Sequence, residues 1–542
     1  MLKLAIDSLK SKDITHSHLT QFALLLVGIA IMEGIFRFLM RKVIIGVSRK
    51  VEYDLRNDYF RHLEKMSLSF FYRYKTGDLM ARATNDLEAV RQVVGPAIMY
   101  SFNTLVSMAA FGIMIHINLK LTLLAMVPLP IMAFVINRIA RRLNKAYQKI
   151  QAKYADITSK VQENISGVRV VKAYVQEGGE SQSFQKLNEE YVSLNLGMAK
   201  LRGYMTATMT VLVGLGSLII LWFGGKLVLQ NSISLGDFVA FFAYLGRLTW
   251  PMIALGWVIN LIQQGTASMG RINRVFKEKP EIADTHATLK DLNDIQGKIE
   301  FRDVSFAYNG APVLQKIRLT IEKGQTLAIV GHTGSGKSTL INLIPRLLDA
   351  TEGQILIDGL DVRKIPLDLL RRNIGYVPQD TFLFSETIKA NIGFGVNATT
   401  EQSIEEAAEI SQIRKDINDF PDGFDTLLGE RGVNISGGQK QRTAIARAVI
   451  RKPKILILDD SLSAVDTYTE EAILRRLRSI MRERTSIIVS HRVSTVQHAD
   501  LIVVLEEGQI KERGSHEELL AINGLYAELY EQQLLEEALE SF

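Results

Sequence analysis

Long apolar stretches of membrane-spanning length fill the first half of the chain. The predicted spans are, approximately, residues 19–45, 94–115, 121–136, 204–229 and 238–262. Such stretches stop after about Lys277. From Gly297 onward, short β-branched runs alternate with helical stretches, which is typical of an α/β domain. The pattern therefore predicts a helical membrane part followed by a separate α/β part.

The boundary between the two parts lies in a polar segment, KEKPEIADTHATLKDLNDIQG, which contains Pro280 and is typical of a linker. We therefore expect a transmembrane domain over residues 1–277, a linker over 278–298 and an α/β domain over 299–542. A chain of 542 residues is too long for one compact core, which agrees with this division.

Lysine and arginine concentrate in two long connections of the membrane part. Residues 46–93 carry nine and residues 139–203 carry eleven, whereas the connectors at 116–118 and 230–236 carry none. Basic loops stay in the cytoplasm, so both long connections are predicted there, as helices that extend past the bilayer. With five spans, this orientation puts the α/β domain in the cytoplasm and the amino terminus outside. We therefore expect either a further span upstream or a remnant of one in residues 1–10.

Composition excludes several kinds of chemistry. The chain has no cysteine, which excludes disulfides, thiolate catalysis and cysteine-ligated metals. The formal net charge of +6 is accounted for by the basic loops. No basic, aromatic-rich patch is present, so nucleic acid is not an expected partner. No cleavable signal peptide is visible in the sequence MLKLAIDSLKSKDITHSH.

A strand, a glycine-rich loop and a helix are predicted over AIVGHTGSGKSTLINLI, and the loop has the spacing G-x-x-x-x-G-K-S. Glycines let backbone N–H groups turn toward phosphates, so this loop predicts a nucleotide site. Lys337 is expected to reach the β- and γ-phosphates, and the Ser338 hydroxyl to bind Mg²⁺. The predicted ATP-binding residues of the loop are Gly331, His332, Thr333, Gly334, Ser335, Gly336, Lys337, Ser338 and Thr339.

A second apolar strand runs directly into two acids in ILILDDSLSAVD. Asp459 would lie at the carboxyl end of a buried parallel strand, where such folds place their ligands. We expect it to hold the Mg²⁺ water shell. The alternative, a buried aspartate that only caps a helix, is disfavoured by the phosphate loop upstream.

With these motifs, and with NISGGQKQR at 434–442, the chain resembles ABC transporters of the exporter type over nearly its whole length. The resemblance implies a membrane α-helical bundle joined to an α/β P-loop ATPase domain, located in the cell membrane with the ATPase domain in the cytoplasm. It also implies that a signature segment acts on the ATP held by the opposite subunit. That segment is Ile435, Ser436, Gly437, Gly438 and Gln439, with isoleucine where the family usually has leucine.

The same resemblance implies further site residues. Tyr308 matches the aromatic that stacks on adenine, Gln379 matches the glutamine that contacts Mg²⁺ and the attacking water, and His491 matches the histidine at the γ-phosphate. Asp466 ends SAVD, which matches the loop between subunits. GERG at 429–432 matches the segment that senses the membrane domain. Together these matches imply ATP and Mg²⁺ as cofactors, with Ser338, Gln379 and Asp459 at the metal.

The membrane half matches the family more loosely. FFYRYKTGDLMARATNDLEAV and ENISGVRVVKAYVQE resemble the two cytosolic loops whose short helices dock onto the ATPase domains. The family has six spans and five are visible, the first being absent. A misassigned start, a truncation and a real loss are each consistent with this count.

Asp460 occupies the position at which the family usually has a catalytic glutamate. Aspartate is about 1.5 Å shorter, and an error near 1 Å in a general base costs on the order of 10²-fold in rate. The substitution resembles the degenerate subunit of heterodimeric exporters. We therefore expect a half-transporter that binds ATP well, hydrolyses it slowly with Asp460, Gln379 and His491, and pairs with a second exporter half. The alternatives are a homodimeric exporter and an ATP-binding regulatory subunit.

Charged residues interrupt two predicted spans. Glu33 and Arg37 lie one helical turn apart and can pair on one face. Arg247 lies in the last span, with Pro251 as an expected kink. These residues are read as structural ion pairs in preference to substrate ligands. The rest of the cavity is apolar, so the expected cargo is a hydrophobic or amphipathic small molecule or a lipid, of multidrug or lipid type.

Overall fold

Two compact units make up the chain in the computed structural model, which describes residues 2–9, 16–285, 287–289, 291–396, 398–429, 432, 434–465 and 467–540. Unit 1 comprises Met1–Glu64 and Thr76–Glu278. Unit 2 comprises Lys65–Lys75 and Lys279–Phe542. A short piece of the first long connection therefore groups with the carboxyl-terminal half and not with the helices on either side of it.

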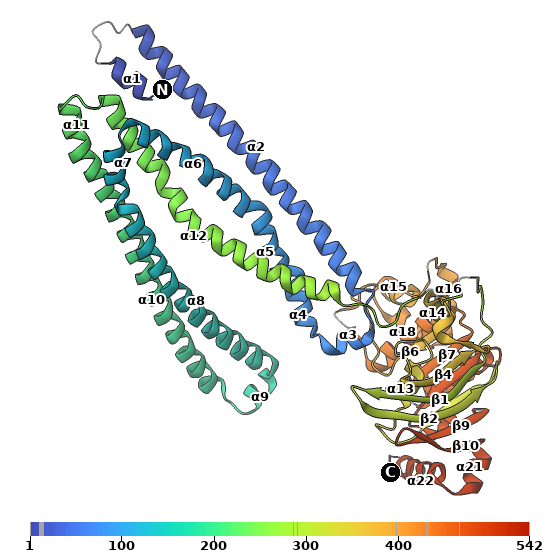
Figure 1. Cartoon of the computed structure of the whole chain (residues 1–542). Helices are drawn as coiled ribbons and strands as arrows, with labels where there is room; N and C mark the ends of the chain where they lie inside the picture. The colour runs from blue at the N-terminus through green and yellow to red at the C-terminus, as the bar shows by residue number, and fades with distance from the viewer. Residues whose placement is uncertain are drawn as a thin grey trace. The chain divides into compact units, whose positions relative to one another are not determined.

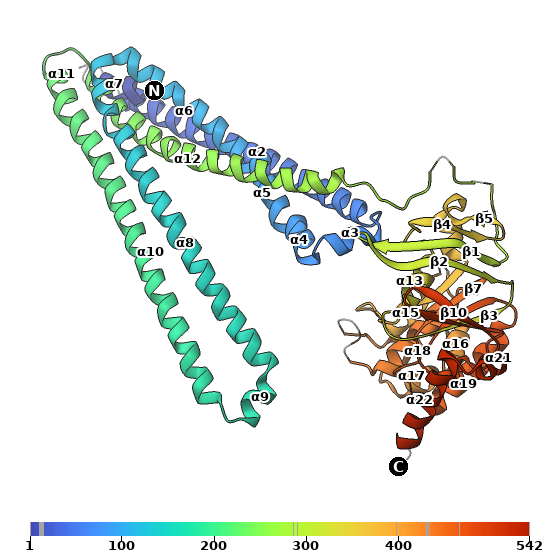
Figure 2. The same cartoon turned by 60° about the horizontal axis from the view of Figure 1, so that its bottom comes forward.

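Helices build unit 1 (Figures 1 and 2). In chain order they are α1 (Leu2–Ser8), α2 (His16–Leu63), α4 (Thr76–Ala81), η1 (Arg82–Asp86), α5 (Leu87–Gln92), η2 (Val93–Ala97), α6 (Ile98–Ile117), α7 (Leu119–Met126), α8 (Pro128–Ser166), α9 (Val168–Ala173), α10 (Glu177–Ile219), η3 (Ile220–Gly224), α11 (Gly225–Leu229) and α12 (Leu235–Lys277). The turns η1, η2 and η3 are π-helical, and η2 contains Pro96.

Four helical stretches of the described residues are long and apolar enough to cross a membrane: Thr20–Leu63, Thr76–Ile117, Leu119–Ser166 and Glu177–Leu229. The fifth predicted span falls in α12, over residues whose side chains lie partly outside those the structure describes, so this count does not test it. The prediction of a fifth span therefore stays a prediction. The 48 residues of α2 cover about 72 Å, well beyond the roughly 30 Å of a bilayer core.

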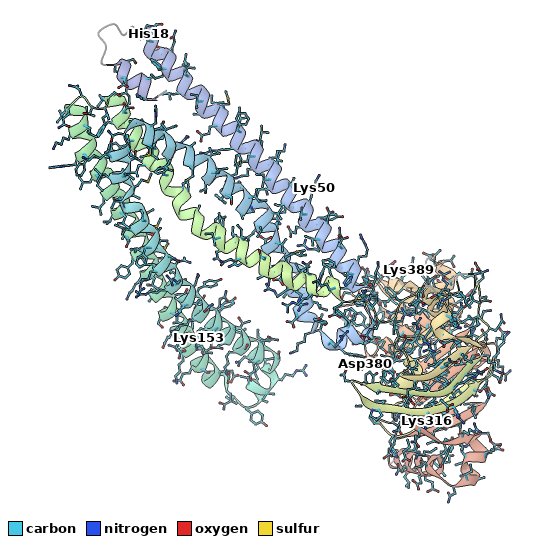
Figure 3. All side chains as sticks on the ribbon, in the orientation of Figure 1. His18, Lys50, Lys153, Lys316, Asp380 and Lys389 are labelled. Atoms are coloured by element: carbon cyan, nitrogen blue, oxygen red, sulfur yellow. The ribbon has the colours of Figure 1, made fainter. Side chains whose placement is uncertain are left out.

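The second long connection is a helical hairpin of α8 and α10. Lys153 of α8, labelled in Figure 3, pairs with Glu190 of α10 at 2.7 Å, and Lys160 pairs with Glu180 at 2.5 Å. Figures 1 and 2 both show the hairpin diverging from α12 toward its tip at α9. Tyr174, just after α9, is 73% exposed. The predicted extended helices of this connection are thus present.

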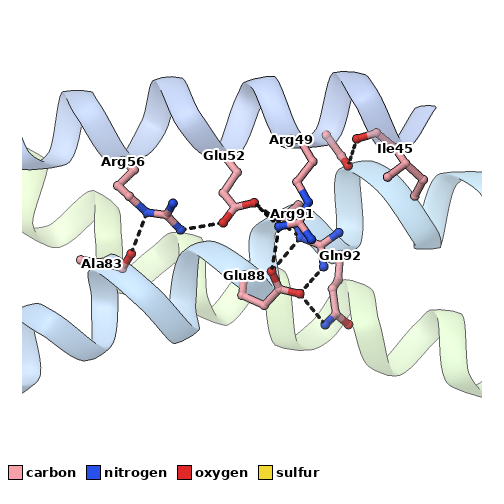
Figure 4. Close-up of polar contacts among 9 residues, drawn as sticks. Ile45, Arg49, Glu52, Arg56, Ala83, Glu88, Arg91 and Gln92 are labelled. Carbon is pink, nitrogen blue, oxygen red and sulfur yellow. Dashed lines mark hydrogen bonds and ion pairs between the residues drawn. The ribbon is translucent and has the colours of Figure 1, made fainter. Parts of the chain in front are cut away.

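Charged side chains join α2 to α5 (Figure 4). Glu52 is buried and accepts hydrogen bonds from Arg56 at 2.6 Å and from Arg49 at 2.9 Å. Arg91 of α5 lies 3.6 Å from Glu52 and also bonds Glu88 of its own helix. Because the buried carboxylate is surrounded by guanidinium groups, its desolvation is compensated and the two helices are held in register.

The start of α12 is fixed by α1. Asp7 accepts hydrogen bonds from the Gly236 N–H and the Ser234 hydroxyl, both at 2.7 Å. A Cβ on Gly236 would lie 2.4 Å from the Lys3 carbonyl oxygen, so only glycine permits this approach. Ser234 also caps α12 through a reciprocal bond pattern with Asp237. Farther along, α12 continues through Pro251 as one helix.

Two sheets form the framework of unit 2. The strands are β1 (Ile299–Tyr308), β2 (Ala311–Ile321), β3 (Thr326–Val330), β4 (Glu352–Ile357), β5 (Leu360–Asp361), β6 (Ile374–Val377), β7 (Ile455–Asp459), β8 (Thr485–Val489), β9 (Leu501–Glu506) and β10 (Gln509–Gly514). The first sheet is antiparallel in the order β2-β1-β4-β5. The second has the order β10-β9-β3-β8-β7-β6, parallel except for β10. This is the α/β domain that the sequence predicts.

Helices cover the sheets of unit 2. They are α3 (Leu68–Arg73), α13 (Lys337–Asn342), η4 (Val362–Lys364), α14 (Leu367–Arg372), α15 (Ile388–Gly393), α16 (Glu401–Ile410), α17 (Arg414–Asp419), η5 (Gly423–Asp425), α18 (Gly437–Val449), α19 (Thr467–Met481), α20 (Val493–Val496), α21 (His516–Ile522) and α22 (Leu525–Glu540). Strands β7 and β8 are buried along their whole length, as continuous apolar runs in a covered parallel sheet should be.

The short helix α3 of the first long connection packs within unit 2. Phe70 is buried, and the Ser69 hydroxyl and Arg73 both donate to Glu281, at 2.5 and 3.1 Å. The Ser67 hydroxyl accepts from the Ile282 N–H at 3.0 Å. The first loop thus carries a short helix held to the predicted linker, and its docking on the ATPase domain stays a prediction.

Candidate nucleotide site

The carboxyl ends of four neighbouring parallel strands meet at one edge of the second sheet, which we call the P-loop edge. Strand β3 leads into Gly331, β7 ends at Asp459, His491 follows β8 and Gln379 follows β6. Register pairs Val377 of β6 with Leu458 of β7, and Asp459 with Val489 of β8. Chain segments up to 160 residues apart in sequence thus bring the predicted residues to one edge, where α/β sheets bind ligands.

The loop from Gly331 to Gly336 requires its glycines. Gly331, Gly334 and Gly336 have φ angles of +144°, +85° and +101°. A Cβ on Gly331 would lie 2.1 Å from the Leu505 carbonyl oxygen, and one on Gly336 would lie 2.9 Å from a Leu314 methyl group. The loop therefore has the shape of a phosphate cradle because larger residues are excluded from it.

Two polar groups in the loop fit an anionic ligand. The Lys337 ammonium group donates to the carbonyls of Gly331 and His332, at 2.7 and 2.9 Å. Burial lowers the pKa of Lys337, while the charges of Asp459 and Asp460 act in the opposite direction. The Ser335 hydroxyl is buried without a hydrogen-bond partner among the described residues. A phosphate would satisfy this orphaned group and compensate the buried cation.

Ser338 and Asp459 form a pair suited to a divalent cation. The Ser338 hydroxyl donates to Asp459 Oδ1 at 3.2 Å, and Asp459 is 3% exposed. Burial raises the pKa of Asp459, and the neighbouring charge of Asp460 raises it further. Among the described residues no group of three His, Asp or Glu side chains could hold a metal by itself. Mg²⁺ commonly binds one or two carboxylates together with substrate phosphates, and this pair fits that mode.

Asp460 is held firmly by its backbone. Its φ angle is +44°, a conformation that aspartate adopts more readily than most residues. Its N–H donates to the Val489 carbonyl at 2.8 Å, and its carbonyl accepts from the Ser463 hydroxyl at 3.0 Å. Because the backbone is anchored on both sides, the length of the side chain decides how far the carboxylate reaches.

His491 and Gln379 flank the two acids on the P-loop edge. Partial burial lowers the pKa of His491, the charge of Lys337 lowers it further, and Asp460 opposes both effects. The structure thus brings His491 into the field of Lys337 and Asp460. Gln379 lies exposed two residues beyond β6.

Tyr308 ends β1 and is 36% exposed. Its ring meets Phe306 edge-on at 4.7 Å and Tyr72 of α3 edge-on at 6.4 Å. The sequence analysis missed Tyr72, because no local pattern relates it to a strand more than 200 residues later.

The predicted signature segment lies at the start of α18. Ser436 caps the helix: its hydroxyl accepts from the Gln439 N–H at 3.2 Å, and the Gln439 side chain accepts from the Ser436 N–H at 3.0 Å. The Gln439 amide also donates to Asp416 at 2.9 Å. Ile435 is partly buried against the core formed by α15, α16 and α18, which agrees with a packing role.

Gln441 connects the signature helix to the residues after Asp460, and sequence analysis missed it. Its amide donates to the Ser463 hydroxyl at 3.0 Å, and its carbonyl accepts from the Ala464 N–H at 2.9 Å. Asp466, predicted to act between subunits, lies outside the described residues, as do Glu430 and Arg431 of GERG. The rest of GERG is described: Gly432 N–H donates to the Gly429 carbonyl at 2.8 Å.

A P-loop ATPase fold with a signature helix, carried on a chain with several membrane-spanning helices, defines the class of ATP-driven membrane transporters. Residues 1–252 match the family described as the ABC transporter transmembrane region, and residues 314–463 match the family described as ABC transporter.

Individual relatives agree with this class. The chain is 40% identical over 541 residues to a probable multidrug resistance ABC transporter ATP-binding/permease protein, YheI, of Bacillus subtilis, covering 98% of this chain and 91% of that protein. It is 37% identical to an ATP-dependent lipid A-core flippase of Syntrophus aciditrophicus, covering 95% and 86%. A bacterial Atm1-family ABC exporter solved with ATP bound has a TM-score of 0.81 at 28% identity, covering 98% and 95%.

The chain belongs to the ABC transporter family, as an exporter with fused transmembrane and ATP-binding domains. It is a multi-span membrane protein that binds ATP and couples ATP hydrolysis to transport. Exporters of this family act as dimers on substrates from the membrane.

Proposed function

We propose that this chain is the degenerate-site half of a heterodimeric exporter. Its own P-loop edge holds ATP but hydrolyses it slowly, because Asp460 stands where a longer carboxylate is needed. Its signature segment, Ser436 to Gln439, completes the faster site on the partner. The observation that carries the proposal is the anchored backbone of Asp460, which cannot advance to make up the missing methylene.

The proposed roles of the other residues are those that the family resemblance implies for their positions. Lys337 and the loop N–H groups bind the β- and γ-phosphates, and Ser338, Asp459 and Gln379 hold Mg²⁺. The ion would neutralise developing phosphate charge. His491 contacts the γ-phosphate, and Asp460 orients the attacking water, while Tyr308 stacks on adenine.

The proposed cargo is an amphipathic or hydrophobic compound or a lipid. The names of the relatives support this class, since one is called a multidrug resistance transporter and another a lipid A-core flippase. The apolar membrane helices agree with a cargo that enters from the bilayer.

Changing the length of residue 460 tests the proposal. The chain purified from its own membranes with its partner is compared with Asp460→Glu and Asp460→Asn. Asp460→Asn should leave turnover within about twofold, because the partner's site carries most of it. Asp460→Glu should raise turnover by allowing both sites to work, since about 1 Å of reach is worth on the order of 10²-fold at one site. Loss of most activity in Asp460→Asn would reject the degenerate-site assignment.

Affinity purification with a tagged copy of this chain distinguishes a heterodimer, a homodimer and a regulatory subunit. A tagged copy of this chain that brings down only an untagged copy of itself, with full turnover, indicates a homodimeric exporter. A distinct chain in a one-to-one complex supports the heterodimer. An Asp460→Glu chain that stays inactive beside that distinct partner indicates an ATP-binding regulatory subunit.

A further inference from the structure

Three charged side chains meet in the membrane-spanning region of unit 1. Glu33 Oε1 accepts from Arg37 Nη2 at 2.5 Å, one turn along α2. Glu33 Oε2 accepts from Arg247 Nη2 of α12 at 2.7 Å. The sequence analysis treated Arg247 separately, and the structure joins it to the pair. Each oxygen of one carboxylate therefore orients one guanidinium group.

The three side chains lie deep within their apolar runs. Glu33 is about 20 Å from either end of the run at 19–45, at 1.5 Å per residue. Arg247 is about 14 Å into the run at 238–262, from the same, external side. The two depths are similar, so the bond between α2 and α12 joins these helices near the centre of the predicted bilayer.

The exposed fractions of the three side chains indicate which face of α2 and α12 carries them. The side chains of Arg37 and Arg247 are 67% and 64% exposed, and that of Glu33 is 36% exposed. An arginine that faces lipid at this depth is costly, and intramembrane charges almost always face a bundle interior or a water-filled path. The triad therefore marks the side of α2 and α12 that faces the internal path of the exporter dimer.

The triad carries more positive than negative charge. One carboxylate against two guanidinium groups leaves a net charge of +1. A guanidinium has five N–H donors, and neither arginine has a hydrogen-bond partner other than Glu33 among the described residues. Planar oxyanions match such a fork of donors and a surplus of positive charge. A cationic ligand, in contrast, would find its only carboxylate already doubly paired.

We propose that Arg37 and Arg247, oriented by Glu33, form a subsite for the anionic headgroup of an amphiphilic substrate: a phosphate, sulfate or carboxylate on an apolar tail. The inference rests on the proposed function in one respect, the amphipathic nature of the cargo. Arg37 and Arg247 contact the headgroup, and Glu33 is a positioning residue.

Direct binding tests the subsite independently of ATP turnover, so its outcome is separate from that of the Asp460 variants. The full-length protein, purified with its partner in nanodiscs of zwitterionic lipid, is titrated with radiolabelled dodecyl phosphate. Dodecyltrimethylammonium and dodecyl maltoside carry the same tail with a cationic and a neutral head. Arg37→Gln and Arg247→Gln should each weaken dodecyl phosphate binding about tenfold or more and leave dodecyl maltoside binding unchanged. Arg202→Gln is the matched control, because it removes an exposed arginine from a different helix, α10.

The direction in which Glu33→Gln changes the affinity for dodecyl phosphate distinguishes a binding subsite from a structural ion cluster. The glutamine oxygen can still accept a hydrogen bond and help orient a guanidinium group, while loss of the carboxylate raises the net charge of the triad from +1 to +2. Dodecyl phosphate should therefore bind more tightly than to the unmodified protein. A purely structural ion cluster predicts the opposite, with all three variants losing binding of every amphiphile alike. That result, or preferential binding of dodecyltrimethylammonium, would overturn the proposal.

Two competitors identify the source of the anion. Inorganic phosphate at equal concentration should not displace dodecyl phosphate, and equal displacement would overturn the requirement for an amphiphile. Phosphatidylglycerol added to the nanodisc supports a membrane lipid as the occupant if it competes. If it does not, binding that still depends on Arg247 supports a smaller anionic amphiphile.

Discussion

Two regions of unit 2, the P-loop edge and the signature segment, are here called its two faces. They differ in whether every expected functional group is present. At the P-loop edge the phosphate cradle is fully formed, yet the position that should activate water carries the short side chain of Asp460. At the signature segment, Ser436, Gly437, Gly438 and Gln439 form a regular capped helix start with every cap bond in place. Under the proposed function, one chain combines an intact segment for a neighbour's nucleotide with a weakened site for its own.

The two faces are also mechanically connected. A Cβ on Gly438 would lie 2.9 Å from the Ala464 carbonyl oxygen, and Gln441 bonds both Ser463 and Ala464. Residues 463–465 therefore run between Asp460 and the signature segment. The contacts of this segment do not use the side chain of Asp460, so the proposed weak site is compatible with a regular signature segment.

The largest effect is expected at the signature segment. In Gly438→Ala the new methyl group meets the Ala464 carbonyl oxygen, so the helix start must shift by a few tenths of an ångström or more. ATP turnover of the assembled exporter should fall on the order of 10²-fold, because the displaced segment serves the faster site. ATP affinity of this chain's own P-loop should change less than twofold. A phosphate-release assay and equilibrium binding of a fluorescent ATP analogue measure the two quantities.

Gly178→Ala is the matched control for that variant, because Gly178 lies in helix α10 with open space around the new methyl group. It should leave turnover unchanged. If Gly438→Ala kept full turnover, the contrast between the two faces would be wrong.

The second effect concerns the P-loop edge. Lys337→Ala removes the buried ammonium group and should weaken ATP binding to this chain about 10- to 100-fold, as expected for a charge-assisted hydrogen bond. Turnover of the exporter should fall less than in Gly438→Ala. Lys323→Ala, an exposed lysine bonded to Gln296, is the control for loss of a positive charge. Equal losses of turnover in Lys337→Ala and Gly438→Ala would mean that both sites hydrolyse ATP at similar rates.

Local motifs explain why much of this site could be predicted. Gly331 to Ser338, Asp459 and the segment Ile435 to Gln439 each lie within a few residues of sequence, where spacing alone specifies strand, turn or helix. The parallel strands were recognisable as short buried runs. The position of Asp460 after β7 followed from the same pattern, although its backbone bonds to Val489 and Ser463 did not.

Contacts between distant segments explain what could not be predicted. Tyr72 meets Tyr308, and Glu33 meets Arg247, across more than 200 residues of sequence. No periodicity relates such pairs, because their distance depends on the packing of whole helices.

The third-largest effect is expected on substitution of Asp459, the buried acid at the P-loop edge. The raised pKa of Asp459 means that the folded protein binds a proton more tightly than the unfolded chain does, so its ionised form lowers stability at pH 7. Asp459→Asn should therefore raise the nucleotide-free unfolding midpoint, by about 2–4 °C for each 1 kcal/mol regained, while abolishing the Mg²⁺ dependence of ATP binding. Asp380→Asn, at an exposed acid in the same domain, should leave both unchanged. A lower midpoint in Asp459→Asn would contradict the burial argument.

The smallest effect uses pH to distinguish the faces, since Ile435 to Gln439 contain no titratable side chain whereas the P-loop edge contains His491. Because the pKa of His491 is lowered by burial and by Lys337, the unfolded chain takes up a proton near pH 6.5 while the folded protein still resists it. Stability is therefore lost as pH falls below about 6.5. Between pH 7.5 and 5.5 the unfolding midpoint should fall less in His491→Gln than in the unmodified protein, by about 1–2 °C.

Burial also lowers the pKa of His498, so His498→Gln must be measured in parallel to remove its share of the slope. The contribution of His491 alone should disappear when ATP analogue saturates the P-loop, because a bound γ-phosphate beside the imidazole favours its protonated form and offsets the effect of Lys337. The contribution of His498 should persist. A His491 slope that is unchanged by nucleotide would place this side chain outside the ATP-binding edge and would remove one of the residues on which the contrast between the two faces depends.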